Sequence, residues 1–122
     1  MIIYVSHSRS FDFLKELYQP IKNSKFAANH QFIFPHETSA EAYPSRKLFM
    51  DKGCDLVLAE VSFPSTGQGI ELGWADTSGI KIVCVSREGI KVSDSLKVIA
   101  KDFLIYKNGE DLVNKLSEYL QK

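Results

Sequence analysis

Short, continuous runs of hydrophobic residues alternate along the chain with segments in which hydrophobic residues recur every three or four positions. A continuous apolar run is typical of a strand buried in a parallel sheet, and the longer spacing is typical of an amphipathic helix. The apolar runs therefore predict five strands, at residues 2–6, 30–35, 55–61, 80–86 and 103–106.

The segments between these strands have helical spacing. They predict helices at residues 11–21, 45–53, 68–79 and 93–100, and a last helix that carries Leu112, Val113, Leu116, Tyr119 and Leu120 on one face. Pro20 is expected to perturb the first helix, and Gly53 and Gly79 to end the second and third. The fourth helix is expected to begin at a capping serine.

The alternation of strands and helices predicts a single α/β domain over residues 1–122, with a five-stranded, mainly parallel sheet of the flavodoxin-like, doubly wound kind. Ligands of such folds bind at the carboxyl ends of the strands, near the point where the strand order reverses. Three polar segments follow the first three strands, at 6–10, 35–45 and 62–69, and are expected to meet there.

Composition limits the classes of function. The chain has 15 basic and 15 acidic residues, a net charge of zero and no basic stripe, which argues against binding of a nucleic acid polymer. Neither a signal peptide nor a membrane span is predicted at the amino terminus. Cys54 and Cys84 lack metal-ligand spacing and are expected to be reduced core thiols of a cytoplasmic protein, so no metal or cofactor is predicted.

The segment after the third strand is rich in small residues. Gly67 and Gly69 allow close approach of the backbone to a ligand, Ser65 offers a hydroxyl, and the helix that follows offers free N–H groups, which together suit a phosphate. Glu71 is expected in the first turn of this helix. The helix dipole stabilises an acid there by roughly 0.3–1 kcal/mol, but a carboxylate at the mouth of a cleft also suits nucleophilic attack on a sugar carbon.

The stretch "DLVLAEVSFPSTGQGIELGWA", residues 55–75, resembles the signature of the nucleoside 2-deoxyribosyltransferase superfamily. It is most similar to the branch that hydrolyses 2′-deoxynucleoside 5′-monophosphates. The positions that match the signature are Ala59, Glu60, Val61, Pro64, Ser65, Gly67, Gly69, Glu71, Leu72 and Gly73. The resemblance implies an N-glycosidase that acts on a small nucleoside or nucleotide and assembles as a homodimer or larger oligomer.

The resemblance also implies roles for single residues. Glu71 matches the nucleophile that forms a glycosyl-enzyme intermediate. Ser65 matches the residue that holds the 5′-phosphate, with Gly67 and Gly69 bringing backbone N–H groups to the same phosphate. Transferases that act on unphosphorylated nucleosides usually carry Asp in place of this serine, and an Asp would repel a phosphate.

Three further residues match positions around the substrate. Tyr4, at the end of the first strand, matches a tyrosine that borders the sugar and positions the nucleophile. His36 falls where the hydrolases carry a histidine beside the base. Ser95 matches a serine that reaches the phosphate site of the neighbouring subunit.

The chain departs from the family at the general acid. The family's Asp on the helix before the third strand falls near Lys47 here. General acid help is worth ~10²–10⁴-fold in rate, and the sequence leaves four substitutes open, namely Glu37, Glu41, Glu60 and His36. The segment 6–10 also lacks the family's glycines, so that His7 and Arg9 either reach the ligand or crowd it.

Other interpretations of the sequence stay open. Without the acid the chain is a candidate nucleotide-binding or sensing module, and a base-exchanging transferase is a third hypothesis that Ser65 argues against. Asp55 is interpreted as a structural acid that begins the third strand. Trp74 is interpreted as packing in the core or a dimer interface.

Overall fold

The computed structural model describes residues 1–121 and contains one five-stranded sheet in which every pair of neighbouring strands is parallel. The strands are β1 (Ile2–His7), β2 (Gln31–Ile33), β3 (Leu56–Glu60), β4 (Lys81–Arg87) and β5 (Asp102–Tyr106). Their order is β2-β1-β3-β4-β5. The predicted parallel α/β fold is therefore confirmed, with the strand order of the flavodoxin-like group.

The strand order reverses between β1 and β3, because β2 lies on the outer side of β1. The register pairs Ile3 with Leu56 and His7 with Glu60, so β1 and β3 end side by side. This carboxyl edge is where a ligand site is expected in a doubly wound sheet.

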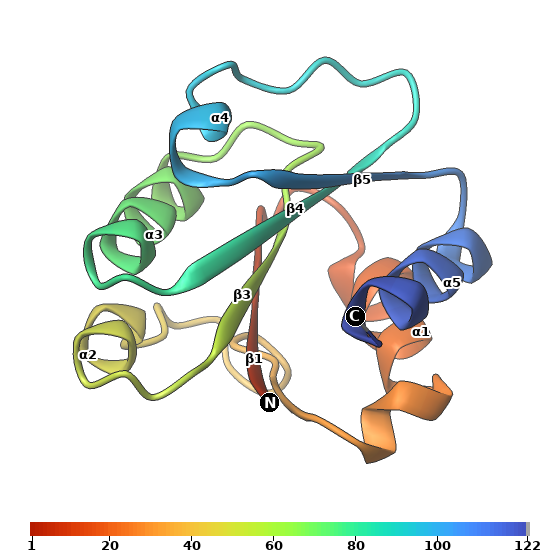
Figure 1. Ribbon diagram of the computed structural model, residues 1–122, viewed down its shortest axis with the longest axis horizontal. Coiled ribbons are helices and arrows are strands. Elements are labelled where there is room, and N and C mark those ends of the chain that lie inside the picture. The colour runs from red at the N-terminus through yellow and green to blue at the C-terminus, as the bar shows by residue number, and fades with distance from the viewer. Residues whose placement is uncertain (122) are drawn as a thin grey trace.

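Helices cover both faces of the sheet (Figure 1). On one face lie α2 (Ser45–Met50), α3 (Thr66–Thr77) and α4 (Leu96–Ile99), and on the other lie α1 (Gln19–Lys22) and α5 (Gly109–Leu120). Two short turns, η1 (Leu14–Tyr18) and η2 (Lys25–Ala28), flank α1. Among residues 1–121, no helix is long and apolar enough to cross a membrane.

Alternate residues of each strand pack into two separate cores, one on each face of the sheet, because successive side chains of a strand point to opposite faces. Ile3 and Leu58 pack towards α1 and α5, whereas Val57 and Ile82 pack towards α2 and α3. The two predicted core thiols, Cys54 and Cys84, are buried and unpaired, and burial raises the pKa of each to about 11.

Several predicted boundaries are wrong. The helix expected at 11–21 is perturbed by Pro20, as predicted, but the perturbation is the wide turn η1, in which the Gln19 N–H donates to the Leu14 carbonyl. Lys52, with φ of 57°, and not Gly53, takes the left-handed conformation after α2. Gly79 does take it after α3, with φ of 75°.

The elements near the sheet edges are shorter than predicted. β2 is limited to Gln31–Ile33, and the helix expected at 93–100 is reduced to Leu96–Ile99. Ser95 precedes that helix but makes no capping hydrogen bond with its side chain.

Candidate active site

The three polar segments that follow β1, β2 and β3 line one cavity of about 450 Å³ at the carboxyl edge of the sheet. The sequence predicted that these three segments would meet, and the cavity lining confirms it. The lining residues are His7, Arg9, His36, Ala42, Tyr43, Ser45, Ser65, Gly67, Gln68, Ile70, Glu71 and Trp74.

Glu71 lies in this cavity, half-buried, but not in the first turn of its helix as predicted. Helix α3 begins two residues earlier than expected, because the Ser65 side chain accepts a hydrogen bond from the Gln68 N–H at 3.3 Å and so caps the helix. Glu71 therefore lies in the second turn. The helix dipole acts mainly within the first turn, so it does not by itself explain an acid at this position.

Tyr4 makes the closest contact with the candidate nucleophile. Its hydroxyl donates to Glu71 Oε2 at 2.7 Å. Tyr4 lies in the middle of β1, whereas the sequence predicted it at the end of the strand. It reaches Glu71 although only 1% of its surface is exposed. The ring is held edge-on against Phe49, with 5.3 Å between ring centroids.

The environment of Tyr4 keeps the phenol protonated. Burial and the negative charge of Glu71 both raise its pKa far above the ordinary value. The phenol is thus a permanent donor to Oε2, and Glu71 Oε1 has no hydrogen-bond partner within residues 1–121. One carboxylate oxygen is fixed and the other is unpartnered, in a residue that lines the cavity.

The small-residue turn carries fewer free N–H groups than the sequence predicts. Gly69 donates its N–H to the Ser65 carbonyl at 3.0 Å, as the first bond of α3, so it offers none to a ligand. The Gln68 N–H is taken by the Ser65 side chain. The donors that remain at this helix start are the N–H groups of Thr66 and Gly67 and the Ser65 hydroxyl, and a Cβ added at Gly67 would meet no atom within 4 Å.

His7 lies in the same cavity but is fully engaged. Its Nε2 lies 2.5 Å from the Tyr18 hydroxyl and its Nδ1 lies 2.7 Å from the Ser8 carbonyl. The Ser8 carbonyl only accepts, so the proton is on Nδ1, and Tyr18 donates to Nε2. Burial lowers the pKa of His7 to about 4. It is therefore a neutral, structural histidine near neutral pH.

His36 differs from His7 in having a free ring nitrogen. Its backbone N–H donates to the Tyr18 hydroxyl at 3.1 Å, and its Nδ1 donates to the Ser39 carbonyl at 3.2 Å. Nε2 has no such partner within residues 1–121. The ring is half-buried and lies edge-on to His7, with 5.7 Å between ring centroids.

The other predicted substitutes for the general acid do not reach the cavity. Glu60 is buried on the opposite face of the sheet, where it binds Ser62 and Tyr106. Glu37 pairs with Lys22, and Glu41 is exposed outside the cavity lining. Of the four candidates, only His36 lines the cavity with Glu71.

The position predicted to replace the family's Asp is also displaced from the site. Lys47 points into solvent and pairs with Asp51 at 2.6 Å. The residue of α2 that reaches the cavity is Ser45, at the start of the helix, and Tyr43 lies just before it. The sequence carried no periodic signal for these two residues, because Tyr43 precedes and Ser45 begins a helix of only six residues.

Two further predictions concern residues on the outer surface. Trp74 is not a core residue, since 36% of its surface is exposed and it lines the cavity. Ser95 lines a separate cavity of about 400 Å³ on the other side of the turn, which shares Ser65 and Gln68 with the first. Ser95 and Glu71 therefore do not meet within one chain.

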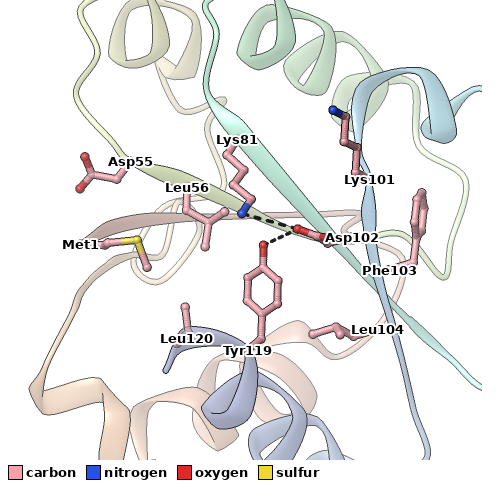
Figure 2. A pocket seen from close by; sticks show the side chains of 10 residues that line it. All are labelled: Met1, Asp55, Leu56, Lys81, Lys101, Asp102, Phe103, Leu104, Tyr119 and Leu120. Atoms are coloured by element: carbon pink, nitrogen blue, oxygen red, sulfur yellow. Dashed lines mark hydrogen bonds and ion pairs between the residues drawn. The ribbon is translucent and has the colours of Figure 1, made fainter. Parts of the chain in front are cut away.

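A larger cavity of about 560 Å³ lies at the amino ends of the strands (Figure 2). Asp102 accepts a hydrogen bond from the Tyr119 hydroxyl at 2.8 Å and lies 3.6 Å from Lys81 Nζ. Asp55, interpreted from the sequence as a structural acid, accepts the Ile2 N–H at 2.7 Å. These polar groups satisfy one another at the edge opposite to Glu71, so this cavity is not the candidate active site.

The fold is that of a solved N-glycosidase. The structure of the Clostridium botulinum CMP N-glycosidase, BcmB, is similar to this chain with a TM-score of 0.70 and 22% sequence identity, over 98% of this chain and 99% of that one. Neither the known family models nor the curated proteins contain a match to the sequence. A likeness at this level of identity shows a shared fold, and the chemistry has to be argued from the cavity itself.

Proposed function

We propose that the protein is an N-glycosidase that hydrolyses the bond between base and sugar in nucleoside or deoxynucleoside 5′-monophosphates. The observation that carries this proposal is the contact between Tyr4 and Glu71 in a cavity whose rim is the turn at Ser65 and Gly67. The fold shared with a CMP N-glycosidase and the resemblance at residues 55–75 support it.

The reaction proceeds in two steps. Tyr4 holds Oε2 of Glu71 while Oε1 attacks the anomeric carbon, and the bonding pair of the C–N bond departs with the base. His36, with both ring nitrogens protonated, donates the Nε2 proton to the departing base while its Nδ1–H stays on the Ser39 carbonyl. Water then attacks the same carbon and gives a proton back to Nε2 of His36, which releases Glu71 and the sugar phosphate with overall retention of configuration.

The proposed phosphate site and the Glu71 carboxylate lie at different turns of α3. The phosphate binds at the helix start, to the Ser65 hydroxyl and the N–H groups of Thr66 and Gly67. Glu71 lies one turn further along, so the ribose separates the two negative charges. His36 follows β2, on the other side of β1 from this turn, and this arrangement supports a position of the base towards His36 and Arg9.

Release of free base tests the proposal. Purified protein is incubated with a panel of ribonucleoside and deoxyribonucleoside 5′-monophosphates and the matching nucleosides, and free base is followed by chromatography. Turnover that is confined to phosphorylated substrates supports the proposal. Tight binding with no release of base from any member of the panel would overturn it.

Ser65→Asp is expected to reverse the preference for a phosphate. A carboxylate at this position repels the phosphate while still capping α3, because Asp is as good an N-cap as Ser. We expect kcat/KM for the 5′-monophosphate to fall at least about 100-fold, the effect of ~2.7 kcal/mol, with little change in thermal stability. Ser65→Asn, a neutral cap, is the control, and equal losses in the two variants would contradict a phosphate contact.

A nucleotide-binding or sensing module is the second candidate function. The replacement of the family's Asp near Lys47 favours it, because the cavity keeps its phosphate donors without that acid. The two functions differ in the assay above, since a sensor binds the nucleotide without releasing base. A base-exchanging transferase is disfavoured by Ser65, as the sequence indicates.

We further propose that the protein works as a homodimer in the cytoplasm. The outer surfaces of α2 and α3 expose Met50, Ile70 and Trp74, and both cysteines are free thiols, as in reducing compartments. Sedimentation velocity measures the assembly directly. A dimer that Met50→Glu and Ile70→Glu together dissociate is the expected result, and a monomer at micromolar concentration contradicts it.

A further inference from the structure

Glu60 is a buried carboxylate that the proposed reaction does not use. It ends β3, directly before the small-residue turn, and exposes only 1% of its surface. An ionised carboxylate is costly to bury unless several hydrogen bonds compensate for lost water. Its contacts therefore indicate what the burial achieves.

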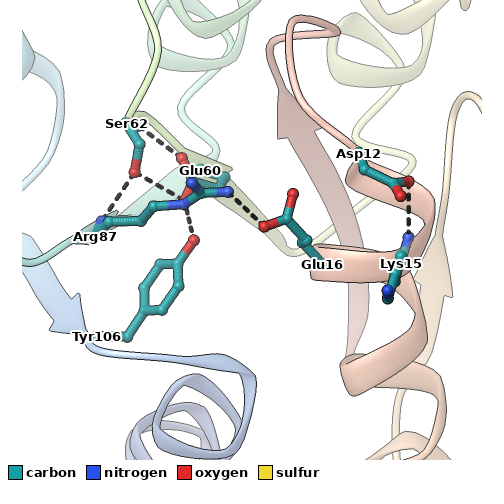
Figure 3. Close-up of polar contacts among 7 residues, drawn as sticks. All are labelled: Asp12, Lys15, Glu16, Glu60, Ser62, Arg87 and Tyr106. Carbon is teal, nitrogen blue, oxygen red and sulfur yellow. Dashed lines mark hydrogen bonds and ion pairs between the residues drawn. The ribbon is translucent and has the colours of Figure 1, made fainter.

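Three donors surround the Glu60 carboxylate (Figure 3). The Ser62 N–H donates to Oε1 at 2.6 Å, and the Ser62 hydroxyl donates to Oε2 at 2.9 Å. The Tyr106 hydroxyl also donates to Oε2. Two of these donors belong to the residue that opens the turn, so the carboxylate fixes both the backbone and the side chain of Ser62.

The main chain of Glu60 holds the other end of the turn. The Gln68 side-chain amide, itself buried, donates to the Glu60 carbonyl at 2.8 Å. The segment between Ser62 and Gln68 contains Ser65 and Gly67, the proposed phosphate contacts. One residue thus binds both ends of the turn that carries them.

The turn is also joined to the rest of the sheet. The Ser62 hydroxyl accepts the Arg87 N–H at 2.8 Å, and Arg87 pairs with Glu16 at 3.1 Å. Tyr106 comes from β5, two strands away from β3. The position of Ser62 is therefore set by β4 and β5 as well as by β3.

We propose that Glu60 is a positioning residue, which holds residues 62–68 in the conformation that receives the 5′-phosphate. The inference rests on the proposed function for the identity of the ligand, whereas the ordering of the turn follows from the contacts of Glu60 alone. Glu60 contacts no substrate and acts through Ser62 and Gln68.

Glu60→Gln tests this role while preserving the shape of the side chain. The amide has one acceptor where the carboxylate has two, so its NH₂ group must face either the Ser62 N–H or the two hydroxyls. We expect faster amide hydrogen exchange in residues 62–68. In a Glu71→Gln background, which prevents turnover, the affinity for cytidine and deoxycytidine 5′-monophosphates is expected to fall about tenfold, the effect of one or two lost hydrogen bonds. Affinity for the matching nucleosides is expected to stay unchanged.

Asp102→Asn is the matched control, because Asp102 also accepts a tyrosine hydroxyl but lies at the opposite edge of the sheet. It is expected to leave both exchange in the turn and binding unchanged. Tyr106→Phe, which keeps both contacts of Ser62, is expected to give a smaller effect than Glu60→Gln.

The outcomes separate the two proposals. Unaltered exchange at 62–68 in Glu60→Gln overturns the positioning role, whatever the activity of the protein. Equal weakening of nucleotide and nucleoside binding overturns it as well, because a general loss of structure does not select for the phosphate. Failure of the unmutated chain to release base, or of Glu71→Gln to bind any nucleotide, overturns the proposed function, and the exchange measurement still decides the role of Glu60 in the turn.

Discussion

Replacing Glu71 by alanine is expected to abolish the release of base from nucleoside 5′-monophosphates, with kcat lowered on the order of 10⁴-fold or more, as for removal of other catalytic nucleophiles. In the proposed reaction this carboxylate forms the bond to the anomeric carbon, and no other carboxylate lines the cavity within residues 1–121. Chromatography of free base under single-turnover conditions measures the loss.

Binding should survive this substitution. The Glu71 side chain lies one turn away from the proposed phosphate contacts, and removing its charge lowers repulsion of an anionic ligand. Calorimetry with the nucleotide separates lost chemistry from lost structure. Asp76→Ala is a matched control on the exposed side of the same helix, and it should retain full activity. If Glu71→Ala still releases base at a tenth of the original rate, Glu71 is not the nucleophile.

The sheet and the place of the cavity were predictable from the sequence. Runs such as residues 55–61 and 80–86 are largely apolar on both faces. A strand needs apolar residues on both faces only when helices cover both sides of its sheet. Once the strands are parallel, their carboxyl ends share one edge. The three polar segments therefore had to meet, and they do so between His7, His36 and Ser65.

The contacts of single side chains were not predictable in the same way. The start of α3 depends on the hydrogen bond between Ser65 and Gln68, which moves Glu71 from the first turn to the second. Tyr4 was expected at a strand end, yet it acts from the middle of β1, because the aromatic side chain is long enough to reach Glu71. Neither the hydrogen bond between Ser65 and Gln68 nor the contact between Tyr4 and Glu71 is encoded in the spacing of hydrophobic residues.

The direction in which a side chain leaves the end of a strand was also not predicted from the sequence. Glu60 precedes the turn directly and is therefore a reasonable acid in the sequence. In the structure it lies on the same face as Val83 and Tyr106, away from Glu71, because alternate residues of β3 face opposite sides. Trp74 was assigned to the core or a dimer interface from its spacing with Ile70, and the structure excludes the core, because both residues lie on the exposed side of α3.

Replacing His36 by asparagine is expected to lower kcat for nucleoside 5′-monophosphates about 10²–10⁴-fold, the usual contribution of a general acid. Nδ1 of His36 is engaged by Ser39, and Nε2 has no hydrogen-bond partner within residues 1–121, so Nε2 is the ring nitrogen available to the departing base. Asparagine keeps a polar side chain of similar reach but has no proton to transfer. His30→Asn, which alters a histidine before β2, is the control and should not affect turnover.

The choice of leaving group distinguishes proton donation from a structural role. A 4-nitrophenyl glycoside of ribose 5-phosphate carries the same sugar phosphate, but its phenolate departs without a proton. His36→Asn should therefore hydrolyse it nearly as fast as the unmutated protein, while its activity on nucleotides stays low. Equal losses on the two substrates would mean that His36 shapes the cavity. An unchanged rate on nucleotides would show that His36 is not the general acid. His7, the other histidine in the cavity lining, is held by Tyr18 and Ser8 and has no free ring nitrogen.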